Sequence, residues 1–454
     1  MENEDTLPEL TLFPHTAATG HQGHLAIGGC DTAALAATYG TPLYIFDETT
    51  LRAKCSEYRR EFGERHPDTL AIYACKAFAN QALIRLLQQE GFGLDVVSGG
   101  EMHLARSAGF PPGLVYFHGN NKSGDELRQA LEWGVGRVVV DNFHELDQLG
   151  RLAAGLGLTQ DVLLRLSPGV DPHTHSHVAT GILDSKFGFP IATGQGEEAL
   201  TRAMSTPGLN LVGLHTHLGS SLYEVGPYRE AIGIVLRFAA GMRQRHGFDL
   251  AEMNVGGGFA VQYRLGSPAP PVSAYAAAIV SAMSDGTREL GLRPPRLVIE
   301  PGRSIVARAG TALYTVGGAK DIPGVRRYVF VDGGMGDNIR PALYDSEYEA
   351  VAANKMGQPR TELVTIAGKF CESGDILIRD IRLPGLEPGD ILAVPAAGAY
   401  SIPMASNYNA SLRPAIVMVR AGRATLIRRR ETYADLTAAE ADPPPHEMTR
   451  PCGN

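Results

Sequence analysis

The feature that most constrains the fold of this chain is a short apolar run followed by a loop and usually a helical stretch. This unit occurs eight times in about 230 residues. The runs span residues 70–74, 93–97, 114–117, 137–140, 162–166, 211–214, 252–255 and 296–299. Eight alternating strands and helices are typical of a (β/α)8 barrel. A doubly wound open sheet is the alternative, but it more often has six or seven strands and a glycine-rich fingerprint after the first.

Beyond residue 308 the helical alternation stops and β-type runs follow, with glycine and proline between them. They span residues 312–316, 328–331, 363–366, 391–394, 416–419 and 425–427. This spacing favours a β-sandwich or β-barrel domain. The predicted fold is therefore α/β plus all-β. Residues 48–308 form a TIM-like barrel, residues 1–47 and 309–433 form a C-terminal β domain, and residues 434–454 form a mobile tail.

Composition excludes several classes of protein. The formal net charge of -8 offers no basic surface for nucleic acid. No stretch approaches 18 unbroken apolar residues, and the acidic N-terminus MENEDTLPEL is unlike a signal peptide. The five cysteines are scattered and contain no CxxC pair, which favours a reducing compartment over a disulfide framework or a structural zinc site. We expect a cytoplasmic protein that binds neither nucleic acid nor a membrane.

Polar residues and glycines gather where the eight predicted strands end. In a barrel, the C-terminal ends of the strands build the active site. These ends carry Lys76, Ser98 to Glu101, His118 to Asn121, Asp141, Arg165, His215 to Ser220, Gly256 to Phe259 and Glu300 to Arg303. Turn glycines placed by chance explain any one of these ends but explain the whole set poorly. The set therefore predicts one polar site at the mouth of the barrel.

Lys76 follows the first predicted strand and is flanked by small residues in the stretch YACKAFAN. A lysine on an apolar wall loses part of its hydration, which favours the neutral amine, and a neutral amine can form a Schiff base with a carbonyl. The alternative is a lysine that extends to solvent from a strand end. The polar set at the other strand ends favours the first interpretation.

Three other strand ends fit the same chemistry. Gly256 to Gly258 allow backbone amides to approach an anion, at the strand end where barrels commonly bind phosphate. Glu300 can hold a pyridine nitrogen protonated. His215 and His217 share one face of a strand, so one of them can stack on an aromatic ring. Together with Lys76, these groups predict a pyridoxal 5'-phosphate site without a metal ion.

Longer motifs identify the chain as a member of a known family. They are YACKAFAN, LDVVSGGEM, HGNNKS, KFGF, GLHTHLGS, NVGGGF, IEPGR, VDGGMGDNIRPALY, CESGD and GAYSIPMASNYN. Over residues 42–421 the chain resembles the diaminopimelate decarboxylases, which belong to the alanine-racemase-like, fold-type III pyridoxal-phosphate enzymes. The resemblance implies decarboxylation of meso-2,6-diaminopimelate to L-lysine and CO2, the last step of lysine biosynthesis. It also implies a homodimer with its active sites at the subunit interface.

The resemblance also implies roles for individual residues. Those implied in catalysis are Lys76, His217 and Cys371. Those implied in cofactor binding are Lys76, His217, Ser220, Gly257, Gly258, Glu300, Arg303 and Tyr400. Those implied in substrate binding are Arg303, Arg340, Tyr344, Glu372 and Tyr400. Cys371 would be the proton donor, entering together with Glu372 from the partner subunit.

Charge supports a substrate with an amino-acid group at each end. Arg303 and Arg340 would hold a carboxylate, and Glu372 matches an ammonium. Ornithine and lysine decarboxylases need only an acid at that position, so the two arginines favour diaminopimelate. An interdomain salt bridge is the alternative for Arg340, and an inert buried thiol is the alternative for Cys371.

Other functions stay open at this point. The chain could be a related decarboxylase of ornithine, arginine, lysine or carboxynorspermidine, since Ser221 stands where many relatives have glutamine. A non-catalytic pyridoxal-phosphate-binding homologue would not need all of its implied substrate residues and the cysteine. A metal-dependent amidohydrolase would carry its HxH pair on the first strand, whereas here the pair is on the sixth. His173, His175 and His177 resemble a metal-binding tract, but we predict a loop beside the active site.

Overall fold

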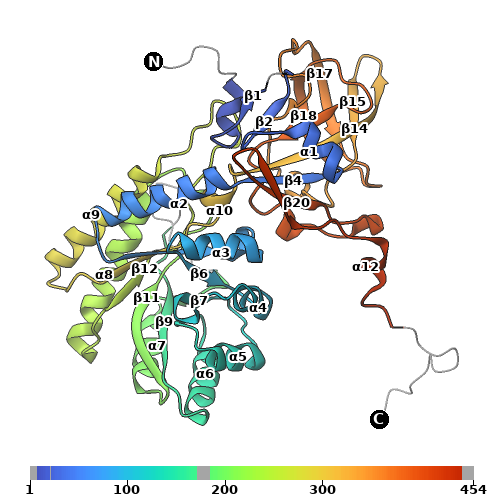
Figure 1. Ribbon diagram of the computed structural model, residues 1–454. Helices are drawn as coiled ribbons and strands as arrows, with labels where there is room; N and C mark the ends of the chain where they lie inside the picture. Colours follow the sequence, from blue (N-terminus) through green and yellow to red (C-terminus); the bar gives the residue numbers. More distant parts are fainter. Residues whose placement is uncertain (1–7, 21, 171–184, 442–454) are drawn as a thin grey trace.

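The computed structural model describes residues 8–20, 22–170 and 185–441, and its N-terminal part is a closed barrel (Figure 1). In this part of the chain, parallel strands pair in the order β5-β6-β7-β8-β9-β11-β12-β13, and β13 pairs with β5 to close the ring. The barrel strands are β5 (Thr69–Ala74), β6 (Gly93–Val96), β7 (Val115–Phe117), β8 (Arg137–Val140), β9 (Gln160–Ser167), β11 (Leu209–His215), β12 (Glu252–Asn254) and β13 (Arg296–Ile299). The short β10 (Phe189–Pro190) adds to β9. The predicted eight-stranded barrel is confirmed.

Helices cover the outside of the barrel (Figure 1). They are α2 (Glu48–Gly63), α3 (Gln81–Gln89), α4 (Gly99–Ser107), α5 (Gly124–Trp133), α6 (Phe143–Gly155), α7 (Gln195–Ser205), α8 (Gly226–His246), α9 (Val272–Glu289) and the single turn α10 (Arg303–Val306). Their ends follow local signals in the sequence. Ser123 and Glu126 form a capping box at the start of α5, and Gly134 ends this helix with a left-handed φ of 79°.

The C-terminal part is a mixed β-sheet with strand order β18-β17-β15-β14-β4-β20-β21, and β16 and β19 pair at its side. Its strands are β4 (Leu43–Asp47), β14 (Gly310–Ile322), β15 (Arg326–Val331), β16 (Val351–Ala352), β17 (Glu362–Ala367), β18 (Ile376–Leu383), β19 (Ile391–Val394), β20 (Ala415–Arg420) and β21 (Arg423–Arg428). Figure 1 shows β4 and β20 side by side, although they come from opposite ends of the chain. The predicted fold class, a barrel with a β domain, is thus confirmed.

Smaller elements complete the β domain. They are β1 (Ala18–Thr19), β2 (Leu25–Ile27), β3 (Cys30–Asp31), α1 (Thr32–Tyr39), α11 (Arg340–Tyr344) and α12 (Tyr433–Thr437). An apolar core between α1, β2 and the central strands includes Leu35, Leu43, Leu313 and Val417. We did not predict β18, because charged residues interrupt its apolar pattern, nor the short α11. α12 includes residues 434–437, the first residues of the predicted tail, and residues 442–454 lie outside the described residues.

The interior of the barrel explains where its polar residues point. Ile72, Tyr116, Val139, Leu163 and Val298, one from each of five strands, form a separate buried cluster. Side chains two residues apart on a strand point to the same face. The residues two positions after the last four of these are polar, and they are His118, Asp141, Arg165 and Glu300. Apolar side chains thus fill the interior of the barrel, and polar side chains lie above them at the C-terminal ends of the strands.

Two global features bear on the predicted environment of the protein. Within the described ranges, no helix combines the length and apolar character needed to cross a bilayer. Cys30, Cys55, Cys75 and Cys371 are free thiols.

Candidate active site

Two adjoining cavities occupy the mouth of the barrel. The larger has a volume of about 690 Å³ and the smaller about 50 Å³. Lys76, His217, Ser220 and Glu300 line both cavities. Side chains from the ends of different strands therefore converge on one site, as the strand-end pattern predicted.

Lys76 lies in a single 3-10 turn, Cys75–Ala77, directly after β5, and its accessible surface faces the cavities. The structure corrects our assumption of an apolar wall, because Asp95 and Glu300 also face this lysine. Burial by itself lowers the pKa of Lys76, but the two carboxylates and the Tyr400 oxygen raise the pKa, and the net direction is upward. The free lysine is therefore an ammonium at neutral pH, and it must lose a proton when it bonds to a carbonyl.

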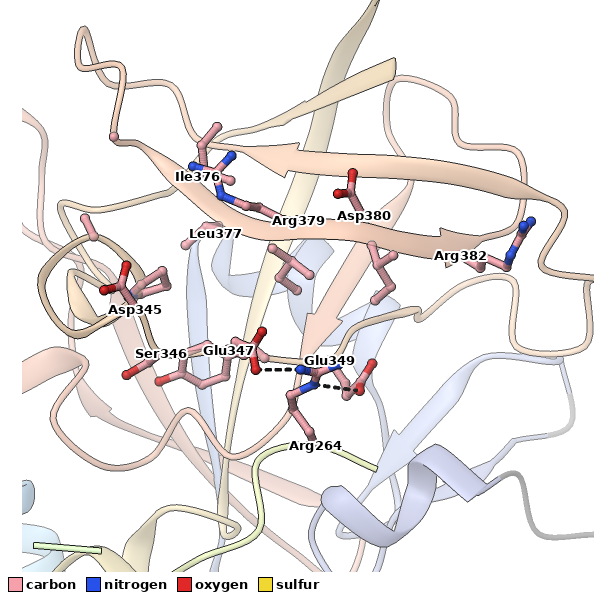
Figure 2. A pocket seen from close by; sticks show the side chains of 16 residues that line it. Arg264, Asp345, Ser346, Glu347, Glu349, Ile376, Leu377, Arg379, Asp380 and Arg382 are labelled. Atoms are coloured by element: carbon pink, nitrogen blue, oxygen red, sulfur yellow. Dashed lines mark hydrogen bonds and ion pairs between the residues drawn. The ribbon is translucent and has the colours of Figure 1, made fainter. Parts of the chain in front are cut away.

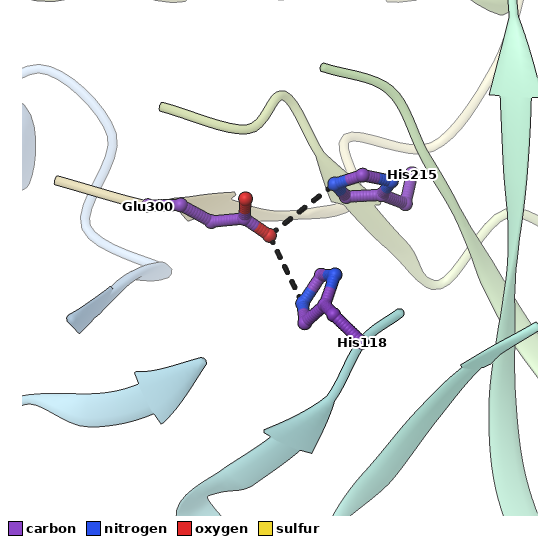
Figure 3. Close-up of side chains that lie close together, drawn as sticks. All are labelled: His118, His215 and Glu300. Atoms are coloured by element: carbon purple, nitrogen blue, oxygen red, sulfur yellow. Dashed lines mark ion pairs between the residues drawn. The ribbon is translucent and has the colours of Figure 1, made fainter. Parts of the chain in front are cut away.

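Glu300 follows β13 and is held by three neighbours, of which Figure 3 shows His118 and His215. The Asn254 amide donates a hydrogen bond to Glu300 Oε1 over 2.8 Å. The imidazole Nε2 atoms of His118 and His215 contact the same oxygen at 3.1 and 3.3 Å. Burial lowers the pKa of both imidazoles well below the ordinary value, so both rings are neutral. This arrangement fixes one carboxylate oxygen and leaves the rest of the group at the cavities.

The same three side chains could be read as a metal site. One ligand atom from each of His118, His215 and Glu300 lies within 4.8 Å of the others. The oxygen concerned, however, already accepts a hydrogen bond from Asn254. We therefore interpret the two histidines as support for the carboxylate. The tract of His173, His175 and His177 lies outside the described residues.

His217 is held as a flat wall of both cavities. The backbone N–H of Gly257 donates to its Nδ1 over 3.2 Å, so the ring proton resides on Nε2. Burial, together with the positive charges of Lys76 and Arg165, lowers the pKa of His217 well below its ordinary value. A β-carbon on Gly256 would lie 2.7 Å from this ring nitrogen, so the glycine is required for the ring to sit there. A neutral, fixed imidazole suits the predicted stacking role.

The smaller cavity has the donors that a phosphate group needs. It is lined by Ser220, Gly257, Gly258, Arg303 and Tyr400. A β-carbon on Gly257 or Gly258 would come within 2.2 or 2.6 Å of a carbonyl oxygen, so only glycine fits. Arg303 Nη2 donates to Ser220 Oγ over 3.0 Å, and Arg303 Nε is buried without a hydrogen-bond partner among the described residues. Hydroxyls, glycine amides and an unsatisfied guanidinium atom together fit an anion.

Arg303 and Arg340 approach a common aromatic residue, Tyr263. Arg303 Nη1 donates to the Tyr263 hydroxyl over 2.9 Å, and the Arg340 guanidinium lies 4.7 Å from the centre of the Tyr263 ring. Arg340 is buried and also donates to the Tyr348 hydroxyl. Within the described residues it forms no ion pair with a carboxylate, so the structure does not support the alternative of an interdomain salt bridge.

Comparison with known proteins identifies the family. The sequence model for "Pyridoxal-dependent decarboxylase, pyridoxal binding domain" matches residues 48–307. The diaminopimelate decarboxylase of Bacillus subtilis (strain 168) is 46% identical over 94% of this chain and 97% of the relative. The solved structure of diaminopimelate decarboxylase from M. jannaschii with L-lysine has a TM-score of 0.90 and 36% identity, covering 94% of this chain and 98% of that one. This chain belongs to the diaminopimelate decarboxylases.

Membership in the diaminopimelate decarboxylases makes pyridoxal 5'-phosphate the cofactor. The residues present fit this group. Lys76 is available for the aldehyde, Glu300 for the ring nitrogen, His217 for the ring face, and the smaller cavity for the phosphate. The expected substrate end lies toward Arg303 and Arg340.

Four predicted site residues lie apart from the cavities. The residues that line neither cavity are Arg340, Tyr344, Cys371 and Glu372; Arg340 is buried, whereas Tyr344 is 60% exposed. Cys371 is also exposed, and its backbone N–H donates to Asn409 Oδ1 over 3.0 Å. The thiol is therefore not buried within the described chain. The predicted action of Cys371 in a partner subunit stays a prediction.

Sequence reasoning missed Asp95, Asn254 and Tyr263. Asp95 was counted as part of an apolar strand, although a charge inside such a run is itself a signal. Asn254 ends β12 two residues before the glycines, where attention to the inward face would have found it. Tyr263 lies in the loop between β12 and α9, and no local pattern distinguishes it.

Proposed function

We propose that this protein decarboxylates meso-2,6-diaminopimelate to L-lysine and CO2, as the last step of lysine biosynthesis. The observation that carries the proposal is that Arg340 and Arg303, which lines the smaller cavity, contact the same residue, Tyr263, because two guanidinium groups match a carboxylate at the far end of the substrate. The similarity of this chain to a relative whose structure was solved with L-lysine, the expected product, supports the same substrate. A decarboxylase of ornithine or lysine would have no use for this pair.

The residues of the chain divide the work. Pyridoxal phosphate, when bound, withdraws electrons from the bond between Cα and the departing carboxylate. Lys76 holds the aldehyde of the cofactor, Glu300 keeps a proton on its ring nitrogen, and His217 covers its ring. The proposed phosphate ligands are Ser220, Gly257, Gly258, Arg303 and Tyr400. The proposed substrate ligands are Arg303, Arg340, Tyr344, Glu372 and Tyr400.

Cys371 is the proposed acid that protonates Cα after CO2 has left. The thiol is exposed, and no cysteine lines either cavity in the described single chain. We therefore propose a homodimer in which Cys371 and Glu372 of one subunit complete the site of the other. In that assembly Glu372 faces the ammonium group at the far end of the substrate.

The division into domains is part of the proposal. Residues 48–308 bind the cofactor, and residues 1–47 and 309–433 form the β domain, which supplies Arg340, Tyr344 and the Cys371 loop. The match of the pyridoxal-binding model to residues 48–307 supports this boundary. The free cysteines support a reducing, cytoplasmic location.

The test is turnover by the purified, cofactor-loaded protein. We expect release of CO2 and L-lysine from meso-diaminopimelate, and no CO2 from L-ornithine, L-arginine or L-lysine, each supplied separately. The visible absorbance of the bound cofactor reports that the protein is loaded. Turnover of another amino acid in place of diaminopimelate would leave the fold and cofactor intact but overturn the proposed substrate. Cofactor absorbance without any turnover would instead favour a non-catalytic homologue.

A further inference from the structure

Tyr263 lies between the two arginines of the proposed carboxylate site. Its hydroxyl accepts a hydrogen bond from Arg303 Nη1 over 2.9 Å. The guanidinium of Arg340 lies 4.7 Å from the centre of its ring, at cation–π distance. The same ring centre is 6.0 Å from the Arg303 guanidinium. One tyrosine therefore contacts both cations through two different parts of its side chain.

Tyr348 of the β domain contacts both Arg340 and Tyr263. Tyr348 is buried, its hydroxyl accepts from Arg340 Nη1, and its ring meets Tyr263 edge to face at 5.6 Å and 85°. Tyr263 belongs to the loop between β12 and α9 of the barrel, whereas Arg340 and Tyr348 belong to the β domain. The tyrosine thus connects the two parts of the chain that carry the two arginines.

The residue after Tyr263 makes a second connection on the outside. Figure 2 shows Arg264 between Glu347 and Glu349, and its ion-pair distances to them are 2.5 and 3.9 Å. Half of the Arg264 side chain and two thirds of the Glu347 side chain are exposed. Exposed ion pairs contribute little to stability. The Arg264 ion pairs therefore add little to the connection that Tyr263 makes.

Two guanidinium groups that contact the same tyrosine repel one another, and Arg340 has no carboxylate partner among the described residues to offset its charge. A tyrosine answers both problems without a negative charge. Its hydroxyl oxygen accepts a hydrogen bond from Arg303, and its ring face attracts the guanidinium of Arg340. A carboxylate in its place would neutralise the pair and compete with the substrate. The neutral ring keeps both arginines free to bind an anion.

We propose that Tyr263 is a positioning residue that sets the spacing of Arg303 and Arg340, and thereby the affinity of the site for the far carboxylate of the substrate. The proposal rests on the proposed function, which gives this arginine pair a dicarboxylic substrate. Tyr263 touches neither the reacting carbon nor the cofactor in this account. Its removal changes KM and not the chemical step.

The experiment compares Tyr263→Phe, Tyr263→Leu and the wild-type protein, all loaded with cofactor. Tyr263→Phe loses the acceptor for Arg303 but keeps the ring on Arg340, so KM for meso-diaminopimelate rises about tenfold. Tyr263→Leu loses both contacts, so KM rises roughly a further tenfold. kcat and cofactor absorbance stay near the wild-type values. Tyr223→Phe is the matched control, because Tyr223 is exposed and, among the described residues, its hydroxyl donates a hydrogen bond only to the Val261 carbonyl in the same region.

A second readout separates this proposal from the proposed function. Calorimetric binding of pimelate, a seven-carbon dicarboxylate, to the same holoproteins reports on the arginine pair without turnover. We expect the wild type to bind pimelate and both Tyr263 variants to bind it more weakly, in the order of their KM values. An inactive wild type that shows this order would overturn the substrate but keep the role of Tyr263. A loss of kcat at unchanged KM, equal pimelate affinities, or no binding by the wild type would overturn the role of Tyr263.

Discussion

At the scale of single residues, the site is defined by buried charges that face one another. Asp95 and Glu300 both interact electrostatically with Lys76. His118 Nε2 lies 3.9 Å from Asp95 Oδ1. Burial and the charge of Glu300 raise the pKa of Asp95, the charges of Lys76 and Arg165 lower it, and the net pKa is about 7. Burial raises the pKa of Glu300 as well. Burial therefore raises the pKa of both carboxyl groups at the barrel mouth.

The raised pKa of Asp95 predicts how stability depends on pH. Its native pKa is about 7 and its ordinary value is 3.8, so between these values the native state holds a proton that the unfolded chain releases. Stability from this group is complete below pH 4 and is lost as pH rises to 7, with a slope of up to about 1.4 kcal/mol per pH unit. Asp95→Asn in the cofactor-free protein should flatten this slope, measured by urea unfolding at several pH values.

The control for this prediction is Asp285→Asn. Asp285 lies on α9 with more than half of its side chain exposed, so its loss should leave the slope unchanged. Equal slopes for wild type and Asp95→Asn would contradict the assignment of the proton to Asp95.

At the scale of elements, the loops after the strands decide what the barrel mouth can hold. The loop after β12 contains Gly258 at φ 98° and Gly266 at φ 81°. A β-carbon on Gly258 would lie 2.6 Å from the carbonyl oxygen of Gly219, in the loop that carries Ser220. A β-carbon on Gly266 would meet nothing within 4 Å. One loop thus contains two glycines with similar backbone strain and different surroundings.

These two glycines make a matched pair for a test of cofactor binding. Both alanine variants place a side chain at positive φ, which costs about 1–3 kcal/mol of folding stability. Only Gly258→Ala also pushes the Gly219–Ser220 backbone away from the smaller cavity. We expect Gly258→Ala to raise the dissociation constant of pyridoxal phosphate by tenfold or more, roughly 1.4 kcal/mol, and Gly266→Ala to leave it unchanged. Equal effects in a fluorescence titration would show that backbone strain alone matters.

At the scale of the whole molecule, one chain presents a cofactor site at the barrel mouth and a thiol loop elsewhere. The buried carboxylate of Asp375 organises that loop, accepting from the backbone N–H groups of Met335 and Phe370 at 2.7 and 2.8 Å. Cys371 is nevertheless exposed. An ordered loop that presents a free thiol outward fits the proposal that Cys371 of each subunit enters the active site of the other.

Mixed dimers test whether Lys76 of one subunit and Cys371 of the other form one active site. Lys76→Ala and Cys371→Ala should each be nearly inactive alone, because each removes one group from both sites. Co-expression in equal amounts should produce mixed dimers with one intact site, and therefore about a quarter of the wild-type kcat per subunit. Size-exclusion chromatography confirms that the variants still assemble. If mixing restores no activity, Lys76 and Cys371 do not meet across two subunits.

Much of the fold follows from local patterns along the chain. The eight barrel runs, the capping box at Ser123 and the later β-type runs depend on backbone geometry between near neighbours, so they can be read in sequence order. The strand ends also led to Lys76, His217, Gly257 and Glu300, because parallel strands end at the same edge of the barrel. Ser220, Gly258 and Arg303 also belong to the strand ends, and the family resemblance gave them their roles. The site residues found from the resemblance alone are Arg340, Tyr344, Cys371, Glu372 and Tyr400.

Only the tertiary structure decided which of these groups touch and how they are charged. The pairing of β4 with β20, the raised pKa values of Asp95 and Lys76, and the place of Tyr263 between two arginines all join segments far apart in the chain. Periodicity specifies the direction in which a side chain points, so it located the barrel mouth. Burial and charge at a point in space depend on every segment packed there, so the environment of Lys76 and the role of Tyr263 required the folded chain.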